Sequence, residues 1–244
     1  FLFQSSAYAE IWLDALKGSR DEGFYGPTYL PRKFKIAMTI DGENMADLLT
    51  NDLGLAATAS PAGGIDGFHL FAGGGLGMLP SRATTFPRLA DPIGWFPAAL
   101  LVRVVEAAVA VHRDHGDRSD RHHARLKYLL AERGAAWFRG EIEGRAGVYF
   151  EERRPAPWRV ARRLGRITRS DGFWELGLCL PFGRIADREG APIRTTLRRL
   201  IEEFELAVTA TPDQGLILHP VPPTLIAEVE SRLAGLGVLP GDYP

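Results

Sequence analysis

The chain has 244 residues, 45% of them hydrophobic, which is enough to bury the core of one large domain or two smaller ones. Its 29 lysines and arginines nearly balance 30 aspartates and glutamates, so the net charge argues against a general binder of nucleic acids or membrane surfaces. No apolar run approaches the roughly 20 residues that span a bilayer, and the N-terminus has neither Met nor a signal-peptide pattern. These features predict a soluble cytoplasmic protein and a chain that is a piece of something longer.

In the first half of the chain, the sequence pattern predicts strands that are separated by glycine-rich loops and are followed by helices. Aromatic and β-branched residues between turn signals predict strands at 7–13, 34–40, 53–59 and 68–72. Pro97 then opens a helix whose apolar residues recur at helical spacing, and further helices are expected at 117–131 and 135–145. A charged, proline-rich stretch at 151–157 predicts a domain boundary.

In the second half of the chain, the sequence pattern predicts strands at 173–180 and 183–186, a helix at 194–204, strands at 206–211 and 216–219, and a helix at 223–236. This order is typical of an α+β layer in which helices cover one face of a sheet. Cys179, the single cysteine, lies in an apolar run and is expected to be buried and inert. One thiol cannot ligate an iron–sulfur cluster or a structural zinc ion, so we predict no metal site in this chain.

The segment Arg32-Lys33-Phe34-Lys35 places three cations in four positions before an apolar run. Because side chains alternate between the faces of a strand, Lys33 and Lys35 would share one face while Phe34 points to the other. Two ammonium groups beside the planar guanidinium of Arg32 would suit an anionic ligand. The alternative is an exposed strand edge that the lysines protect from pairing.

The run Gly73-Gly74-Gly75-Leu76-Gly77 follows a predicted strand but matches neither a dinucleotide-binding fingerprint nor a P-loop. It indicates that the backbone passes close to something that leaves no room for a Cβ atom. A tight turn and a ligand cradle both remain open at this point.

The predicted helix 117–131 is densely basic. Its residues Arg118, Arg121 and Arg125 stand at i, i+3 and i+7, on one helical face. This face is either a solvated surface with salt bridges to nearby aspartates or a contact for a polyanion such as a multiply carboxylated cofactor. The adjacent His122 and His123 diverge in direction on a helix and do not form a metal site.

Together these segments resemble the siroheme-dependent sulfite and nitrite reductases, and the sulfite reductase hemoproteins most closely. The matching pieces occur in family order along nearly the whole chain. They are residues 7–14, 25–35, 50–54, 67–68, 73–77, 85–94, 120–128 and 183–185, with a variant Thr-Pro-Asp-Gln element at 211–214.

The resemblance implies a chemistry and a set of roles. Siroheme, an iron tetrapyrrole with eight carboxylates, is coupled in this family to a [4Fe-4S] cluster and delivers six electrons to sulfite or nitrite. Lys33 and Lys35 would be catalytic, binding the anion and supplying protons. Cofactor-binding roles would fall on Arg32, Gly73, Gly74, Gly75, Arg121, Arg125 and Lys127.

The resemblance also implies an α+β fold. A siroheme-binding α/β domain with a mixed sheet and helices would occupy 1–164, a ferredoxin-like α+β half-domain 165–236, and the start of a further domain 237–244. The four cluster cysteines would follow the last residue, so this chain alone is expected to be inactive.

The expected function is part of an assimilatory sulfite reductase hemoprotein, a cytoplasmic oxidoreductase of sulfur assimilation. Its electron donor would be ferredoxin or a flavoprotein reductase subunit, with no nucleic-acid or membrane partner. A siroheme nitrite reductase and a catalytically incomplete fragment that cannot hold the cluster remain alternatives. A relative in tetrapyrrole biosynthesis ranks last, because the Arg-Lys-Phe-Lys motif is fully kept.

Overall fold

The computed structural model describes residues 22–25, 28–159 and 163–240. The chain divides into two compact units, Phe1–Val160 and Ala161–Pro244, and each unit has a hydrophobic core of its own. The strand predicted at 7–13 lies outside the described residues. Among the helices that the structure describes, none is long and apolar enough to cross a membrane.

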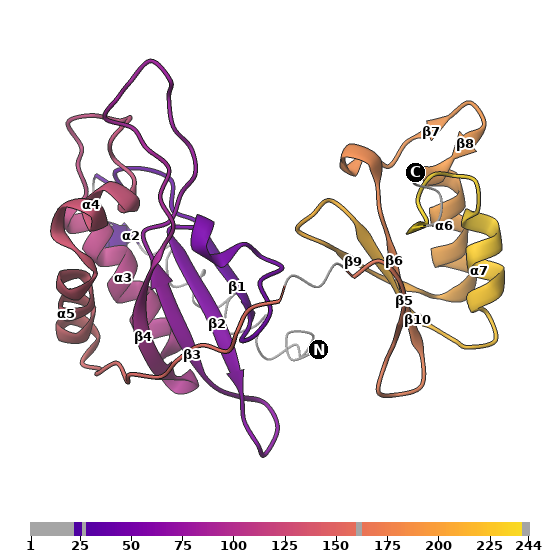
Figure 1. The fold of residues 1–244 in the computed structure, drawn as a ribbon, viewed down its shortest axis with the longest axis horizontal. Coiled ribbons are helices and arrows are strands. Elements are labelled where there is room, and N and C mark those ends of the chain that lie inside the picture. The colour runs from indigo at the N-terminus through magenta and orange to yellow at the C-terminus, as the bar shows by residue number, and fades with distance from the viewer. Residues whose placement is uncertain (1–21, 26–27, 160–162, 241–244) are drawn as a thin grey trace. The chain divides into compact units, whose positions relative to one another are not determined.

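The first unit is built on a four-stranded sheet with the order β1-β2-β3-β4 (Figure 1). Its strands are β1 (Ile36–Ile40), β2 (Leu53–Ala59), β3 (Ile65–Ala72) and β4 (Asp91–Pro97). β1 runs parallel to β2, whereas β3 is antiparallel to both of its neighbours, so the sheet is mixed as predicted. Strand β4 escapes sequence prediction because Pro92, Gly94 and Pro97 interrupt its apolar pattern.

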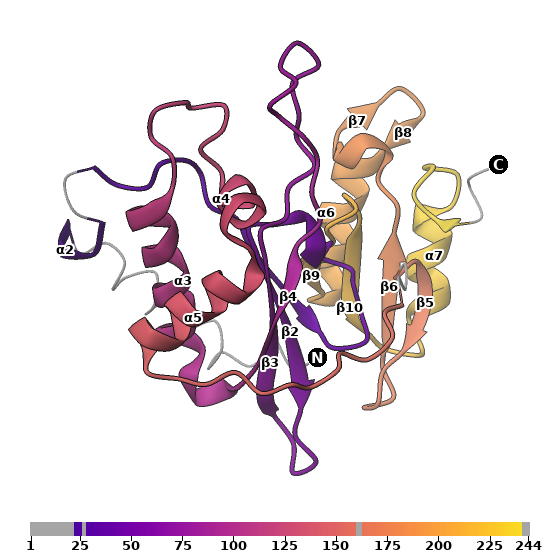
Figure 2. The same cartoon turned by 60° about the vertical axis from the view of Figure 1, so that its left-hand side comes forward.

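Three helices cover one face of this sheet, as Figures 1 and 2 show: α3 (Leu101–His115), α4 (Leu126–Arg133) and α5 (Ala135–Ala146). The short helix η3 (Ala98–Leu100) leads from β4 into α3. Leu55 of β2 and Leu70 of β3 are buried in one core cluster with Val104 of α3. Removing this apolar surface from water stabilises the layered arrangement.

The opposite face of the sheet carries a smaller core. Phe71 of β3 is buried there with Leu48 of the short helix η2 (Leu48–Thr50). The indole of Trp158 packs edge-on against Phe71, with ring centroids 5.1 Å apart. Another short helix of this unit is α2 (Glu22–Tyr25).

The helix predicted at 117–131 is wrong over its first part, because α4 begins only at Leu126. The Asp117 carboxylate accepts the backbone N–H and the hydroxyl of Ser119, and the Asp120 carboxylate accepts the N–H of His122. Such local bonds offer the backbone an alternative to helical hydrogen bonding. Residues 117–125 therefore form an irregular segment.

The second unit has a four-stranded antiparallel sheet with the order β5-β6-β10-β9. Its strands are β5 (Gly165–Thr168), β6 (Trp174–Leu178), β9 (Ala207–Ala210) and β10 (Leu216–Val221). The helices α6 (Ile193–Phe204) and α7 (Ile226–Leu233) lie on one face of this sheet (Figure 2). Leu176, Leu200 and Val229 share its buried cluster, so the predicted α+β layer is confirmed.

Two details of the second unit correct the sequence predictions. The strand expected at 183–186 is wrong: the turn η4 (Pro181–Gly183) comes first, with Phe182 at φ 56°, and pairing resumes only in the hairpin β7 (Asp187–Arg188) and β8 (Ala191–Pro192). A left-handed residue ends the extended backbone at that point. Cys179 is half-buried, not fully buried as expected.

Candidate functional site

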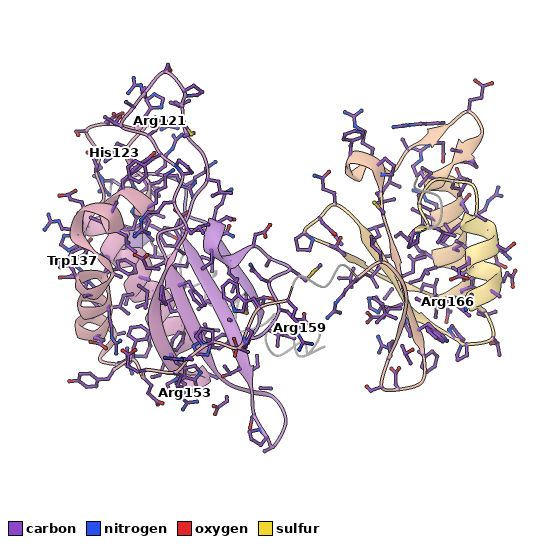
Figure 3. The ribbon with its side chains drawn as sticks, viewed as in Figure 1. Arg121, His123, Trp137, Arg153, Arg159 and Arg166 are labelled. Carbon is purple, nitrogen blue, oxygen red and sulfur yellow. The ribbon has the colours of Figure 1, made fainter. Side chains whose placement is uncertain are left out.

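A cationic cavity of about 320 Å³ opens on the first unit. Its walls come from the basic segment 32–35, the loop between β3 and β4, and the irregular segment that precedes α4. Four of its lining side chains are cations, and none of the described residues that line it is acidic. The lining residues are Arg32, Lys33, Gly77, Met78, Leu79, Thr85, Arg121, His122, Arg125 and Tyr128. Arg121 lies at the end of this unit where its long loops gather (Figure 3).

The basic segment alternates as the sequence predicts, although it precedes the hydrogen-bonded strand. Lys33 and Lys35 are exposed, whereas Phe34 packs against the core. The Phe34 ring lies 5.5 Å from the ring of His112 on α3. Lys33 lines the cavity, and Lys35 is not among its lining residues. Strand pairing begins one residue later, at Ile36.

Arg125 is held by a buried carboxylate that the sequence analysis does not single out. The Arg125 Nη2 atom donates to Asp52 Oδ2 over 2.8 Å, and the same oxygen accepts the backbone N–H of Lys35 over 2.9 Å. The Asp52 side chain is fully buried. Burial raises the pKa of Asp52, while the Arg125 guanidinium opposes this rise. The available sequence signal is an acidic residue directly before an apolar strand.

Arg118, Arg121 and Arg125 do not share a helix face, because the segment that carries them is irregular. Arg121 and Arg125 line the cavity. Arg118 instead donates to the backbone carbonyls of Arg113 and Tyr29, each over 2.7 Å. Its guanidinium thereby ties the end of α3 to the chain that leads into the basic segment.

The glycine run is packed tightly against the protein itself. A Cβ atom on Gly74 would lie 2.1 Å from the Leu49 carbonyl oxygen, and one on Gly75 would lie 2.9 Å from Arg125 Nη1. Gly73 has φ +84°, which favours glycine. These three glycines are not among the residues that line the cavity, whereas Gly77 is. Close packing within the protein thus accounts for the first three glycines of the run.

Lys127 has a structural task that the sequence analysis missed. Its side chain is buried, and its ammonium donates to the carbonyl oxygens of Gly75 and Gly77 over 3.1 and 2.6 Å and to that of Phe86. An ammonium group has three donors, and all three are used here. Burial lowers the pKa of Lys127. Lys127 therefore holds the loop that forms one cavity wall, and it is not itself among the residues that line the cavity.

His112 lies beneath the basic segment and is fully buried. Neither ring nitrogen makes a hydrogen bond of good geometry among the described residues. Burial, with a smaller contribution from the nearby cations Arg118 and Arg125, lowers the pKa of His112 to about 4, and the backbone of Arg32 opposes this decrease only in part. The imidazole is therefore neutral at pH 7.

The donor set of the cavity fits a polyanion and does not fit a metal cluster. Guanidinium and ammonium groups form strong, charge-assisted hydrogen bonds with carboxylates. Met78 and Leu79 add partly exposed apolar surface to the same walls. Within residues 22–25, 28–159 and 163–240, no three His, Cys, Asp or Glu side chains gather as metal ligands.

Comparison with known proteins gives one consistent result. Residues 2–150 match the family described as nitrite and sulphite reductase 4Fe-4S domain. The chain is 38% identical to a ferredoxin sulfite reductase of Synechococcus elongatus, covering 96% of this chain and 41% of that protein. It is 41% identical to an NADPH sulfite reductase hemoprotein beta-component of Myxococcus xanthus, over 90% of this chain and 40% of that one.

A solved structure agrees. The NirA protein of Mycobacterium tuberculosis superposes with a TM-score of 0.72 at 28% identity, covering 95% of this chain and 41% of that one. The chain thus spans about two fifths of the length of the relatives that it matches. With more than half of its residues inside the matched region, this chain belongs to the nitrite and sulphite reductase 4Fe-4S domain family.

Proposed function

We propose that this chain forms part of the siroheme-binding wall of an assimilatory sulfite reductase hemoprotein. The observation that carries the proposal is the convergence of Arg32, Lys33, Arg121 and Arg125 on one cavity that no acidic side chain lines among the described residues. Such a cavity concentrates positive potential and favours a ligand with several negative charges.

The residues present fit siroheme but not the iron–sulfur cluster. The carboxylates of siroheme would pair with Arg32, Arg121 and Arg125, whose planar guanidinium groups suit bidentate contacts. When bound, siroheme would supply the iron and the electron transfer that reduce the anion. A [4Fe-4S] cluster needs four thiolates, and this sequence has only Cys179, so these 244 residues do not supply the ligands of a cluster.

The remaining roles follow from position and charge. Lys33, at the cavity, would hold the substrate anion and supply protons to it, with Lys35 on the same side of the segment as its partner. The small size of the glycines would allow the loop backbone to lie close to Arg125. Lys127 would preserve the shape of the loop wall without contacting the ligand.

The proposal extends to the rest of the parent protein. In the second unit, the strands of the four-stranded sheet and the two helices follow one another as ββαββα, a circular permutation of the βαββαβ ferredoxin-like motif. This order, with the strand order β5-β6-β10-β9, supports a ferredoxin-like half-domain. The relatives are named as ferredoxin and NADPH sulfite reductases, so the electron donor would be ferredoxin or a flavoprotein reductase subunit. The parent protein would work in the cytoplasm. Two alternatives remain: nitrite as the substrate, because the family name covers both anions, and an incomplete polypeptide, because the chain lacks cluster cysteines.

The test uses the full-length parent protein and the isolated chain side by side. Purified parent protein should show siroheme absorption and should turn over sulfite faster than nitrite at equal concentrations of anion. Faster turnover of nitrite would favour the first alternative, and no siroheme in the parent protein would refute the proposal. Iron and acid-labile sulfide analysis of the 244-residue chain should find no four-iron cluster.

A further inference from the structure

Arg125, one of the three arginines that line the cavity, owes its position to Asp52. The Asp52 side chain is fully buried, and its Oδ2 atom accepts Nη2 of Arg125 at 2.8 Å. Arg125 keeps 15% of its side chain exposed and lines the cavity. One end of this guanidinium is therefore fixed inside the protein while the side chain still reaches the cavity.

Asp52 also fixes the two other motifs of the site. Its Oδ2 atom accepts the N–H of Lys35 at 2.9 Å, at the end of the basic segment. Its backbone carbonyl accepts the N–H of Gly73 at 2.9 Å, and the carbonyl of Asn51 accepts that of Gly74 at 3.0 Å. One residue thus joins the basic segment, the glycine run and Arg125.

The glycine run closes the arrangement from the other side. A Cβ atom on Gly75 would stand 2.9 Å from Nη1 of Arg125, so this position leaves the guanidinium just enough room. The guanidinium is held between a carboxylate on one side and a glycine on the other. Its direction is set by the protein before any ligand arrives, which reduces the ordering cost of binding.

We infer that Asp52 is a positioning residue, which aims Arg125 and the basic segment at the cavity and thereby raises its affinity for a polycarboxylate. The inference rests on the proposed function for the identity of the ligand. Removing a negative charge beside a cationic cavity should strengthen anion binding if charge alone mattered, whereas loss of positioning should weaken it.

The test compares Asp52→Asn with the wild-type 244-residue chain. Uroporphyrin, a metal-free porphyrin with eight carboxylates, serves as the probe, and its dissociation constant is measured by fluorescence. In metal sites, the partners that orient the ligands typically contribute about 10- to 100-fold in affinity, and by that measure we expect the dissociation constant to rise at least about tenfold. An unchanged or lower dissociation constant would overturn the inference.

The matched control is Asp91→Asn. Asp91 pairs with Arg88, which donates to the Gly73 carbonyl over 2.9 Å, so this pair also supports the glycine run but does not touch Arg125. Uroporphyrin affinity should stay within about twofold of wild type in this control, because Arg125 keeps its anchor. An equal loss in both variants would reduce Asp52 to general support of the loop and would contradict the inference.

A second readout separates this inference from the proposed function. The Arg125 Nε–Hε resonance, followed by ¹⁵N relaxation, should report an ordered side chain in the wild type and a mobile one in Asp52→Asn. Should Asp52→Asn not fold, Gly75→Ala displaces the same guanidinium from the other side, and it should raise the dissociation constant likewise. Absence of uroporphyrin binding in the wild type would count against the proposed function. The inference would then still be decided by whether the Arg125 side chain is ordered in the wild type and mobile in Asp52→Asn.

Discussion

The buried imidazole of His112 makes the first unit sensitive to acid. Its pKa falls from the usual 6.5 to about 4 on folding, chiefly through burial, and Arg118 and Arg125 add to the decrease. Because the folded pKa lies below the unfolded one, the unfolded chain binds more protons between pH 6.5 and 4, and stability falls as the pH falls through that window. At about 1.36 kcal/mol per pKa unit, the loss is about 2 kcal/mol from pH 7.5 to 5 and about 3 kcal/mol by pH 4.

The assay is urea unfolding at several pH values. Unfolding is monitored by amide hydrogen exchange of peptides from α3, which report on the first unit alone. Substitution His112→Gln removes the titrating group, so the difference in unfolding free energy between pH 7.5 and 5 should shrink by about 2 kcal/mol relative to wild type. The control His122→Gln removes an exposed imidazole of the same unit and should keep the wild-type dependence. If His112→Gln kept that dependence too, the reasoning about the buried neutral imidazole would be refuted.

Two further predictions concern the loop wall of the cavity. Lys127→Met leaves the carbonyls of the loop without their ammonium partner and should lower the unfolding free energy by about 2–4 kcal/mol. The control Arg121→Met replaces an exposed cation and should change the unfolding free energy by less than about 0.5 kcal/mol. Equal urea midpoints for the two variants would contradict this prediction. Gly74→Ala forces a Cβ atom against the Leu49 carbonyl and should lower the unfolding free energy by about 1–3 kcal/mol or more, measured by thermal unfolding. Gly77→Ala has open space and is the control, so a Gly74→Ala variant as stable as Gly77→Ala would show that the packing is not tight.

Much of the core follows from sequence pattern, because apolar periodicity reports burial directly. The predicted strand 53–59 matches β2, and the predicted helices 135–145 and 194–204 match α5 and α6 within one residue. The failures have local causes. Asp117 and Asp120 bond to the backbone nearby and prevent a helix that the charge spacing suggested. Two prolines and a glycine conceal β4, although its residues are paired with β3.

The charged residues that line the cavity could be predicted from the sequence, whereas the buried residues that hold them in place could not. The pattern of Lys33 and Arg32 indicates anion binding without any knowledge of the fold, and the cavity contains both residues. Nothing in the sequence distinguishes the buried Lys127 from the exposed cations Arg118 and Arg121, because its role depends on carbonyls that lie 41 to 52 residues away in the chain. Asp52 is equally hidden, since its partner Arg125 lies 73 residues along the chain.

The most direct test of the central claim is sulfite turnover by the full-length parent protein carrying Lys33→Met and Lys35→Met together. Proton donation and anion binding by positioned groups contribute about 100-fold or more, so turnover per bound siroheme should fall by at least about that factor while siroheme absorption stays at the wild-type level. The control Arg133→Met, an exposed cation outside the cavity, should keep wild-type turnover. Wild-type sulfite turnover in the double lysine variant would contradict the account.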